Sequence, residues 1–145
     1  MGVISPKLTL TSNASTASTD AGPLSIALSL SATDSLTVTG VRSKIETITD
    51  TAEVLWAHGD FSDGTETAGT DGGFVYVKNI HASNKISIGH GALEEIVPNN
   101  NAKRVMTLLA GEFAWFPWDF TADILADADG TATDGLETWV FIRTQ

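Results

Sequence analysis

The sequence predicts an all-β protein: a single-domain antiparallel β-sandwich of jelly-roll type spanning residues 1–145. Short segments that alternate apolar and polar residues recur along the chain, and turn residues separate them every 8–12 positions. A chain of 145 residues that is 42% hydrophobic is long enough for one domain with a core of its own. We therefore expect about eight to ten short strands in two packed sheets.

The first half of the chain contains the clearest alternation. Leucines alternate with polar residues in 7–11, and a Ser/Thr-rich segment at about 12–20 follows, which we expect to be mobile. Leucine and isoleucine then occupy every second position of 24–30, which predicts a strand. A further strand is expected from 36 to 48, with a bulge or turn where Gly40 interrupts it.

The second half predicts the remaining strands. They are expected at 54–56, 73–80, 85–89, 102–109, 113–120, 123–128 and 136–143. A helix is plausible only at 91–97, where apolar residues have helical spacing before Pro98.

The segments 111–120 and 136–143 are apolar on both faces when they are read as strands. Leu136, Val140 and Ile142 lie on one face of the last strand, and Trp139 and Phe141 lie on the other. A half-solvated antiparallel strand is apolar on one face only. Both faces are therefore expected to be covered, one by the core and the other by a second subunit.

Six aromatic residues are the candidates for this subunit interface. They are Phe113, Trp115, Trp118, Phe120, Trp139 and Phe141. Because Pro117 cannot donate to a β-ladder, the strand is expected to end there or to lie at a sheet edge. We accordingly expect Trp115 and Trp139 to be buried in inter-strand or inter-subunit positions, and Trp118 to be partly exposed at a rim.

Composition excludes several classes of partner. The formal net charge of −10 would repel nucleic acid and anionic membranes, so neither is expected as a partner. The absence of cysteine favours folding in a reducing cytosol and removes thiolate chemistry. The first thirty residues show no signal-peptide pattern, and no segment reaches the length of a membrane span.

Two loops contain acidic residues that calcium could bind. Residues 58–73 include Asp60, Asp63, Glu66 and Asp71, but their spacing does not match an EF-hand. A second loop begins with residues 127–131, but Ala132 stands where an EF-hand needs its glycine and Thr138 where it needs its glutamate. We interpret both as exposed turns and expect no metal.

Catalytic motifs are absent from the sequence. His58, His81 and His90 lie far apart without paired metal-ligand spacing, which leaves a cupin-like enzyme a minor alternative. We expect neither enzymatic activity nor a cofactor. A second alternative is a carbohydrate- or receptor-binding module in which Trp115, Trp118 and Phe120, together with Asp119, stack on sugar rings.

Several segments together resemble small all-β virion proteins of tailed bacteriophages. These segments are 72–80, 86–89, 108–117 and 139–143, and the resemblance covers about residues 56–143. It implies a non-enzymatic virion protein that is a capsid decoration, neck or tail component, with a capsid decoration or cementing protein favoured, assembled in the host cytoplasm. It also implies a homo-oligomer, with a trimer favoured, and contacts with other virion proteins such as the major capsid protein.

Overall fold

A computed structural model describes most of the chain. The described residues are 2–4, 7–11, 27–31, 36–38, 40–61, 72–91, 104–130 and 134–143, with side chains in 40–61, 72–91, 104–130 and 135–142. The chain divides into two compact units, Met1–Thr37 and Val38–Gln145. The single domain that the sequence predicts over residues 1–145 stays a prediction. The Ser/Thr-rich segment at 12–20 and the possible helix at 91–97 fall outside the described residues, except for Gly91.

The first four strands form two small sheets. Strand β2 (Lys7–Thr11) pairs antiparallel with β3 (Ala27–Ser31), so that Leu8 lies opposite Leu30. Strand β1 (Gly2–Ile4) pairs with β4 (Leu36–Val38). These strands agree with the alternation of leucines in this part of the sequence.

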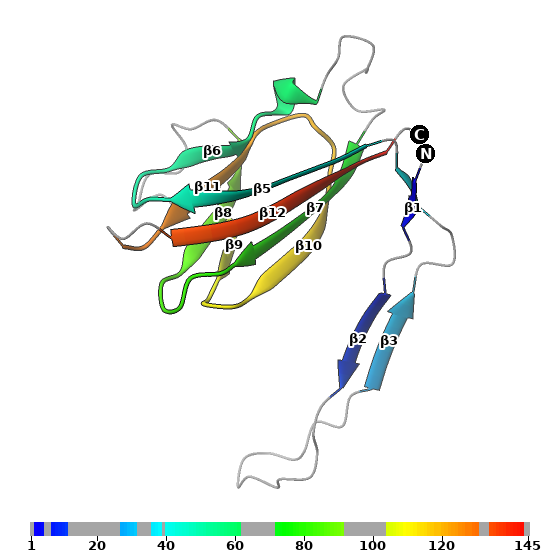
Figure 1. The fold of residues 1–145 in the computed structure, drawn as a ribbon, viewed down its shortest axis with the longest axis horizontal. Coiled ribbons are helices and arrows are strands. Elements are labelled where there is room, and N and C mark those ends of the chain that lie inside the picture. Colours follow the sequence, from blue (N-terminus) through cyan, green and yellow to red (C-terminus); the bar gives the residue numbers. More distant parts are fainter. Residues whose placement is uncertain are drawn as a thin grey trace, which may run out of the picture. The chain divides into compact units, whose positions relative to one another are not determined.

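The described residues of the second unit form eight strands and one turn of 3-10 helix, η1 (His58–Asp60). The strands are β5 (Gly40–Ile48), β6 (Glu53–Trp56), β7 (Gly72–Asn79), β8 (Ile86–His90), β9 (Arg104–Leu108), β10 (Phe113–Trp118), β11 (Ile124–Ala128) and β12 (Asp134–Arg143). They form two four-stranded sheets (Figure 1). We call the sheet β10-β7-β12-β5 the front sheet and the sheet β6-β11-β8-β9 the back sheet.

The pairing confirms the predicted all-β sandwich. Each of the resolved pairs in the two sheets is antiparallel, and successive strands mostly alternate between the sheets. The strand order agrees with a jelly roll, and the jelly-roll type stays a prediction.

The core lies between the sheets and follows from the two-residue period of each strand. From the front sheet, Leu136, Val140 and Val75 are fully buried, and from the back sheet Ile86 and Ile88 meet them. Thr138, a polar side chain of β12 on this face, accepts a hydrogen bond from Nε1 of Trp56 at 2.8 Å. This bond satisfies two polar groups that burial would otherwise penalise.

Four aromatic rings close one end of the core. Phe61 lies at their centre, 5.6 Å from Trp56, 5.2 Å from Trp118 and 5.1 Å from Phe120 between ring centroids. Two cations of β5 cover the cluster, because the guanidinium of Arg42 lies 4.7 Å from the Phe61 ring and the ammonium of Lys44 lies 4.6 Å from the Trp56 ring. Such contacts attract a cation to the electron-rich face of a ring.

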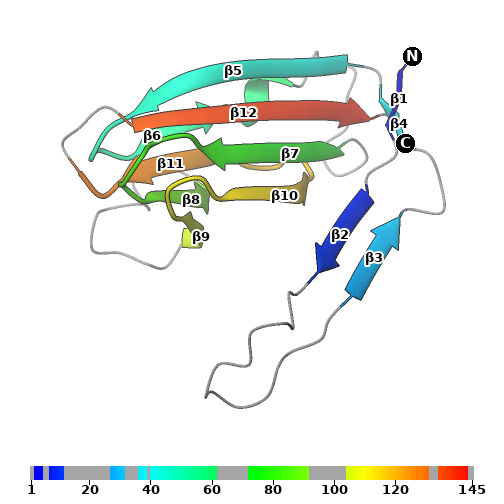
Figure 2. The same cartoon turned by 60° about the horizontal axis from the view of Figure 1, so that its bottom comes forward.

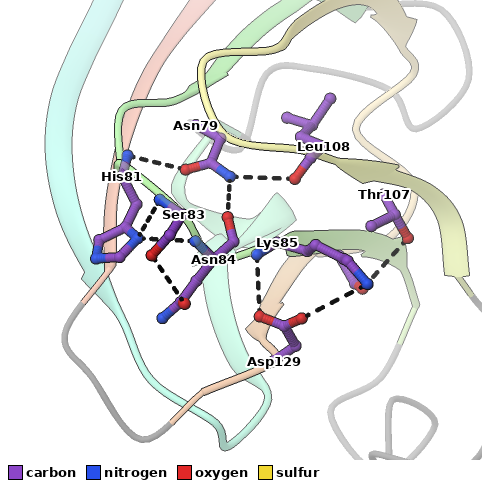
Figure 3. Close-up of polar contacts among 9 residues, drawn as sticks. Asn79, His81, Ser83, Asn84, Lys85, Thr107, Leu108 and Asp129 are labelled. Carbon is purple, nitrogen blue, oxygen red and sulfur yellow. Dashed lines mark hydrogen bonds and ion pairs between the residues drawn. The ribbon is translucent and has the colours of Figure 1, made fainter.

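At the opposite end of β7, a buried asparagine fixes the position of two loops. The side-chain amide of Asn79 donates to the carbonyl oxygens of Asn84 at 2.8 Å and Leu108 at 3.1 Å, and its oxygen accepts from the backbone of His81 (Figure 3). Its backbone also bonds to Gly111 and Glu112 in the turn before β10. Asn79 thereby ties the start of β10 to the end of β7, which sets their register.

Candidate functional site: the aromatic face of the front sheet

The outward face of the front sheet carries a regular grid of side chains. The four strands lie side by side (Figure 2), and their register aligns three residues of each strand into three rows. One row is Pro117, Phe74, Phe141 and Val41; the middle row is Trp115, Tyr76, Trp139 and Ser43; the last is Phe113, Lys78, Glu137 and Ile45. Nine of these twelve residues are aromatic or apolar. We call this grid the aromatic face.

Much of the aromatic face is open to water in the single chain. Trp115 and Trp139 are each 37% exposed, Phe113 is 59% exposed and Ile45 is 72% exposed. With about 150–250 Å² for a whole aromatic side chain, the three rings alone expose roughly 200–300 Å². Contiguous apolar patches beyond a few hundred Å² are uncommon on monomers and mark interaction sites.

The aromatic rings of the face pack against one another. Phe74 and Trp115 are stacked, with centroids 5.3 Å apart and planes 14° apart, and Trp115 lies 5.0 Å from Phe141. Phe141 is in turn stacked against Trp139 at 6.4 Å and 13°. A continuous row of four rings therefore crosses three strands, in which two stacked pairs meet at a tilted contact of 47° between Trp115 and Phe141.

The polar groups of the face are few. Glu137 accepts a hydrogen bond at 3.0 Å from Nε1 of Trp139, and Lys78 lies opposite Glu137 in the register of β7 and β12. Burial, and then the nearby charge of Glu137, raise the pKa of the Tyr76 hydroxyl, which therefore stays neutral at physiological pH. With one lysine and one glutamate, the twelve positions carry no formal net charge, although the whole chain carries −10.

The structure separates the six predicted interface residues into two groups. Phe113, Trp115, Trp139 and Phe141 lie on the aromatic face, where a role in subunit contacts stays a prediction. Trp118 and Phe120 lie in the core and are 3% and 8% exposed. The expectation for Trp118 was therefore wrong, because this ring is buried in the core. Trp115 and Trp139 are exposed in the single chain, and their burial between subunits stays a prediction.

The error has a physical cause at Pro117. Strand β10 continues through Pro117 to Trp118, and β10 is an edge strand, where a residue without an N–H is tolerated. Because side chains alternate, Trp118 points inward, and its Nε1 donates to the carbonyl of Ala122 at 2.9 Å. Phe120 then adopts a left-handed backbone with φ of 57°, and its ring stacks on Phe61.

These placements also contradict the expected sugar-binding site. Two of its three rings, Trp118 and Phe120, are in the core and cannot stack on a ligand. The carboxylate of Asp119 is occupied locally, since it accepts hydrogen bonds from the hydroxyl and the backbone N–H of Thr121. The hydroxyl bond of Thr121 is the main cause of the lowered pKa of Asp119.

The three histidines do not come together as a metal site. Among the described residues, no group of three His, Cys, Asp or Glu side chains is arranged to hold a metal ion. His58 instead pairs with Asp123, with 2.6 Å between Nδ1 and Oδ1, while His81 accepts hydrogen bonds from the turn at Ser83 and Asn84. Of the first acidic loop only 58–61, 72 and 73 are described, so its remaining candidates, Asp63, Glu66 and Asp71, lie outside.

Sequence reasoning missed five of the nine aromatic or apolar members of the face: Val41, Ile45, Phe74, Tyr76 and Pro117. The signal for two of them was present, because Phe74 and Tyr76 alternate with the buried Val75 and Val77, as in the last strand. Strand β7 is thus also apolar on both sides. Val41 and Ile45 alternate with charged residues, so only the pairing of β5 with β12 places them beside the rings.

Comparison with known proteins shows the fold. No protein-family model matches the chain, and no curated protein matches it. One similar solved structure comes from work described as "Bacillus endospore appendages form a novel family of disulfide-linked pili". The likeness covers 81% of this chain and 96% of that one, with a TM-score of 0.50 and 14% sequence identity. In the described part of our chain, no helix is long and apolar enough to cross a membrane.

Proposed function

We propose that this chain is a non-enzymatic structural subunit that self-associates through the aromatic face. One observation carries the proposal: nine aromatic or apolar residues form a contiguous surface on the side of the front sheet that faces away from the core. The roughly 200–300 Å² exposed by Phe113, Trp115 and Trp139 alone is about a third of the roughly 800 Å² that each partner contributes to a standard interface. Tryptophan and tyrosine are also the residues that dominate binding energy at such surfaces.

In its particular form, the proposal is a virion protein. The resemblance of residues 56–143 to small all-β proteins of tailed phages supports a capsid decoration or cementing protein. Such a subunit would assemble in the host cytoplasm, contact the major capsid protein, and form the trimer that the resemblance implies.

The fold likeness favours a second candidate, a subunit of an extracellular filament. The similar structure belongs to pili that are described as disulfide-linked. This sequence contains no cysteine, so disulfides between these residues cannot link its subunits in a filament. The aromatic face offers non-covalent contacts in either setting.

Two measurements test the proposal. Native mass spectrometry and negative-stain electron microscopy of the purified protein should show closed oligomers for a decoration protein and filaments for an appendage subunit. Peptide mass spectrometry of gradient-purified particles should find the chain in virions if the first candidate is right. A protein that stays monomeric and is absent from particles and filaments would contradict both candidates.

A further inference from the structure

We infer that the aromatic face is covered by the aromatic face of a second copy, so that two front sheets stack across a two-fold axis. This inference rests on the proposed self-association and names its partner surface. In sandwiches, apolar sheet faces pack about 10 Å apart with interdigitating side chains, which is the arrangement proposed between the two copies.

The distribution of charge favours the aromatic face of a second copy as the partner surface. Two copies that each carry −10 repel one another, and they can meet most easily where charge is least. The aromatic face is such a place, because its Lys78 and Glu137 balance each other. A basic partner would instead be expected to contact a surface with an excess of carboxylates.

The arrangement of the rings argues against a sugar as the occupant. Sugars stack on the flat side of a ring, yet Phe74 is stacked on Trp115 and Phe141 on Trp139, so one flat side of each of these rings faces a neighbouring ring. Edges and flat sides of aromatic rings from a second copy complement this surface, since aromatic pairs prefer edge-to-face and offset contacts.

The back sheet is a poor alternative partner surface. Its strands β8 and β11 carry Ser87 and Asp127 opposite each other, and its exposed apolar residue among those described is Val105 on β9. The surface that best complements the aromatic face is therefore the aromatic face itself. Contact between identical faces closes after two subunits, so this inference replaces the trimer that the resemblance implies with a dimer.

This geometry places particular residues near the axis. Tyr76 and Trp139 are cross-strand partners in the middle row of the two central strands, so each lies close to its own counterpart in the second copy. Opposite charges introduced at this point in the two copies should attract, whereas like charges should repel.

The experiment compares Trp139→Glu, Trp139→Lys and the control Val105→Glu, an exposed apolar residue on the back sheet. Circular dichroism and urea unfolding first establish that each variant folds. Sedimentation velocity should show a dimer for the unaltered protein and for Val105→Glu. Each Trp139 variant alone should dissociate, with binding weakened about 30-fold or more, as for a central tryptophan at an interface.

Mixing the two Trp139 variants should restore a dimer, because unlike charges then meet near the axis. Added salt should strengthen the unaltered dimer by screening the repulsion between acidic copies. A trimer, or a dimer that persists in both Trp139 variants, would overturn face-to-face stacking and leave self-association standing. A monomer at all concentrations would overturn the proposed function as well.

Discussion

Trp118 and Trp139 offer a direct comparison of a ring that stabilises the fold with a ring that is available for assembly. Trp118 is 3% exposed and lies 5.2 Å from Phe61 and 4.7 Å from Phe120 between ring centroids. Replacement of a buried tryptophan by alanine costs about 3–5 kcal/mol, and the lost hydrogen bond to Ala122 adds about 1 kcal/mol. We therefore expect Trp118→Ala to lower the free energy of unfolding by about 4–6 kcal/mol.

Trp139→Ala should behave differently. The ring is 37% exposed, and its removal opens space to water and leaves no internal cavity. We expect a loss of about 1–2 kcal/mol in the free energy of unfolding, together with loss of the oligomer. Urea unfolding at two protein concentrations separates the two effects, because association stabilises the native state in a concentration-dependent way.

A second variant covers the case in which Trp118→Ala does not fold. Trp118→Phe retains a ring in the cluster and should show an intermediate loss in the free energy of unfolding. A Trp118→Ala protein that loses less than Trp139→Ala, measured at a concentration where both are monomeric, would mean that the inward and outward faces of β10 and β12 are misassigned.

Three further predictions concern the framework of the front sheet. Asn79→Ala removes three buried or partly buried hydrogen bonds and should cost about 3 kcal/mol in urea unfolding; a loss below about 1 kcal/mol would contradict its role. Gly73→Ala should prevent soluble expression or shift the melting temperature strongly, because a Cβ would lie 2.3 Å from the carbonyl oxygen of Phe141; an unchanged melting temperature would refute this contact. The pKa of Asp123 is lowered, chiefly by the backbone N–H of His58, so its contribution to stability is present above pH about 4 and lost as the pH falls below it. The urea midpoint of Asp123→Asn should therefore fall less on acidification than that of the unaltered protein.

The sequence was sufficient to predict the fold class and the existence of an exposed aromatic surface. The alternation in 136–143 identifies a strand with two apolar sides, and that pattern is local. The residues of the strand do not determine which of its two sides faces the core. The inward side depends on the partner sheet, whose Ile86 and Ile88 pack against Leu136 and Val140 and leave Trp139 outside.

The error at Trp118 and Phe120 shows a second limit of sequence reasoning. Proline at 117 is compatible with the end of a strand and equally with the edge of a sheet, and only the strand order distinguishes the two. The positive φ of Phe120 is uncommon for a bulky residue, so propensity argues against the turn that brings its ring into the core. Packing against Phe61 overrides that preference.

The two edge strands of the front sheet restrict how copies of this chain can join. On β10, Pro117 interrupts the series of backbone donors that an added strand would need. On β5, Arg42 and Lys44 point inward over aromatic rings, and an incoming strand that extended the sheet would have to cover these charges. Lengthening of the sheet by successive strands is therefore disfavoured on both sides. A protein with so much exposed aromatic surface can in this way be kept at high concentration without conversion into amyloid-like fibres.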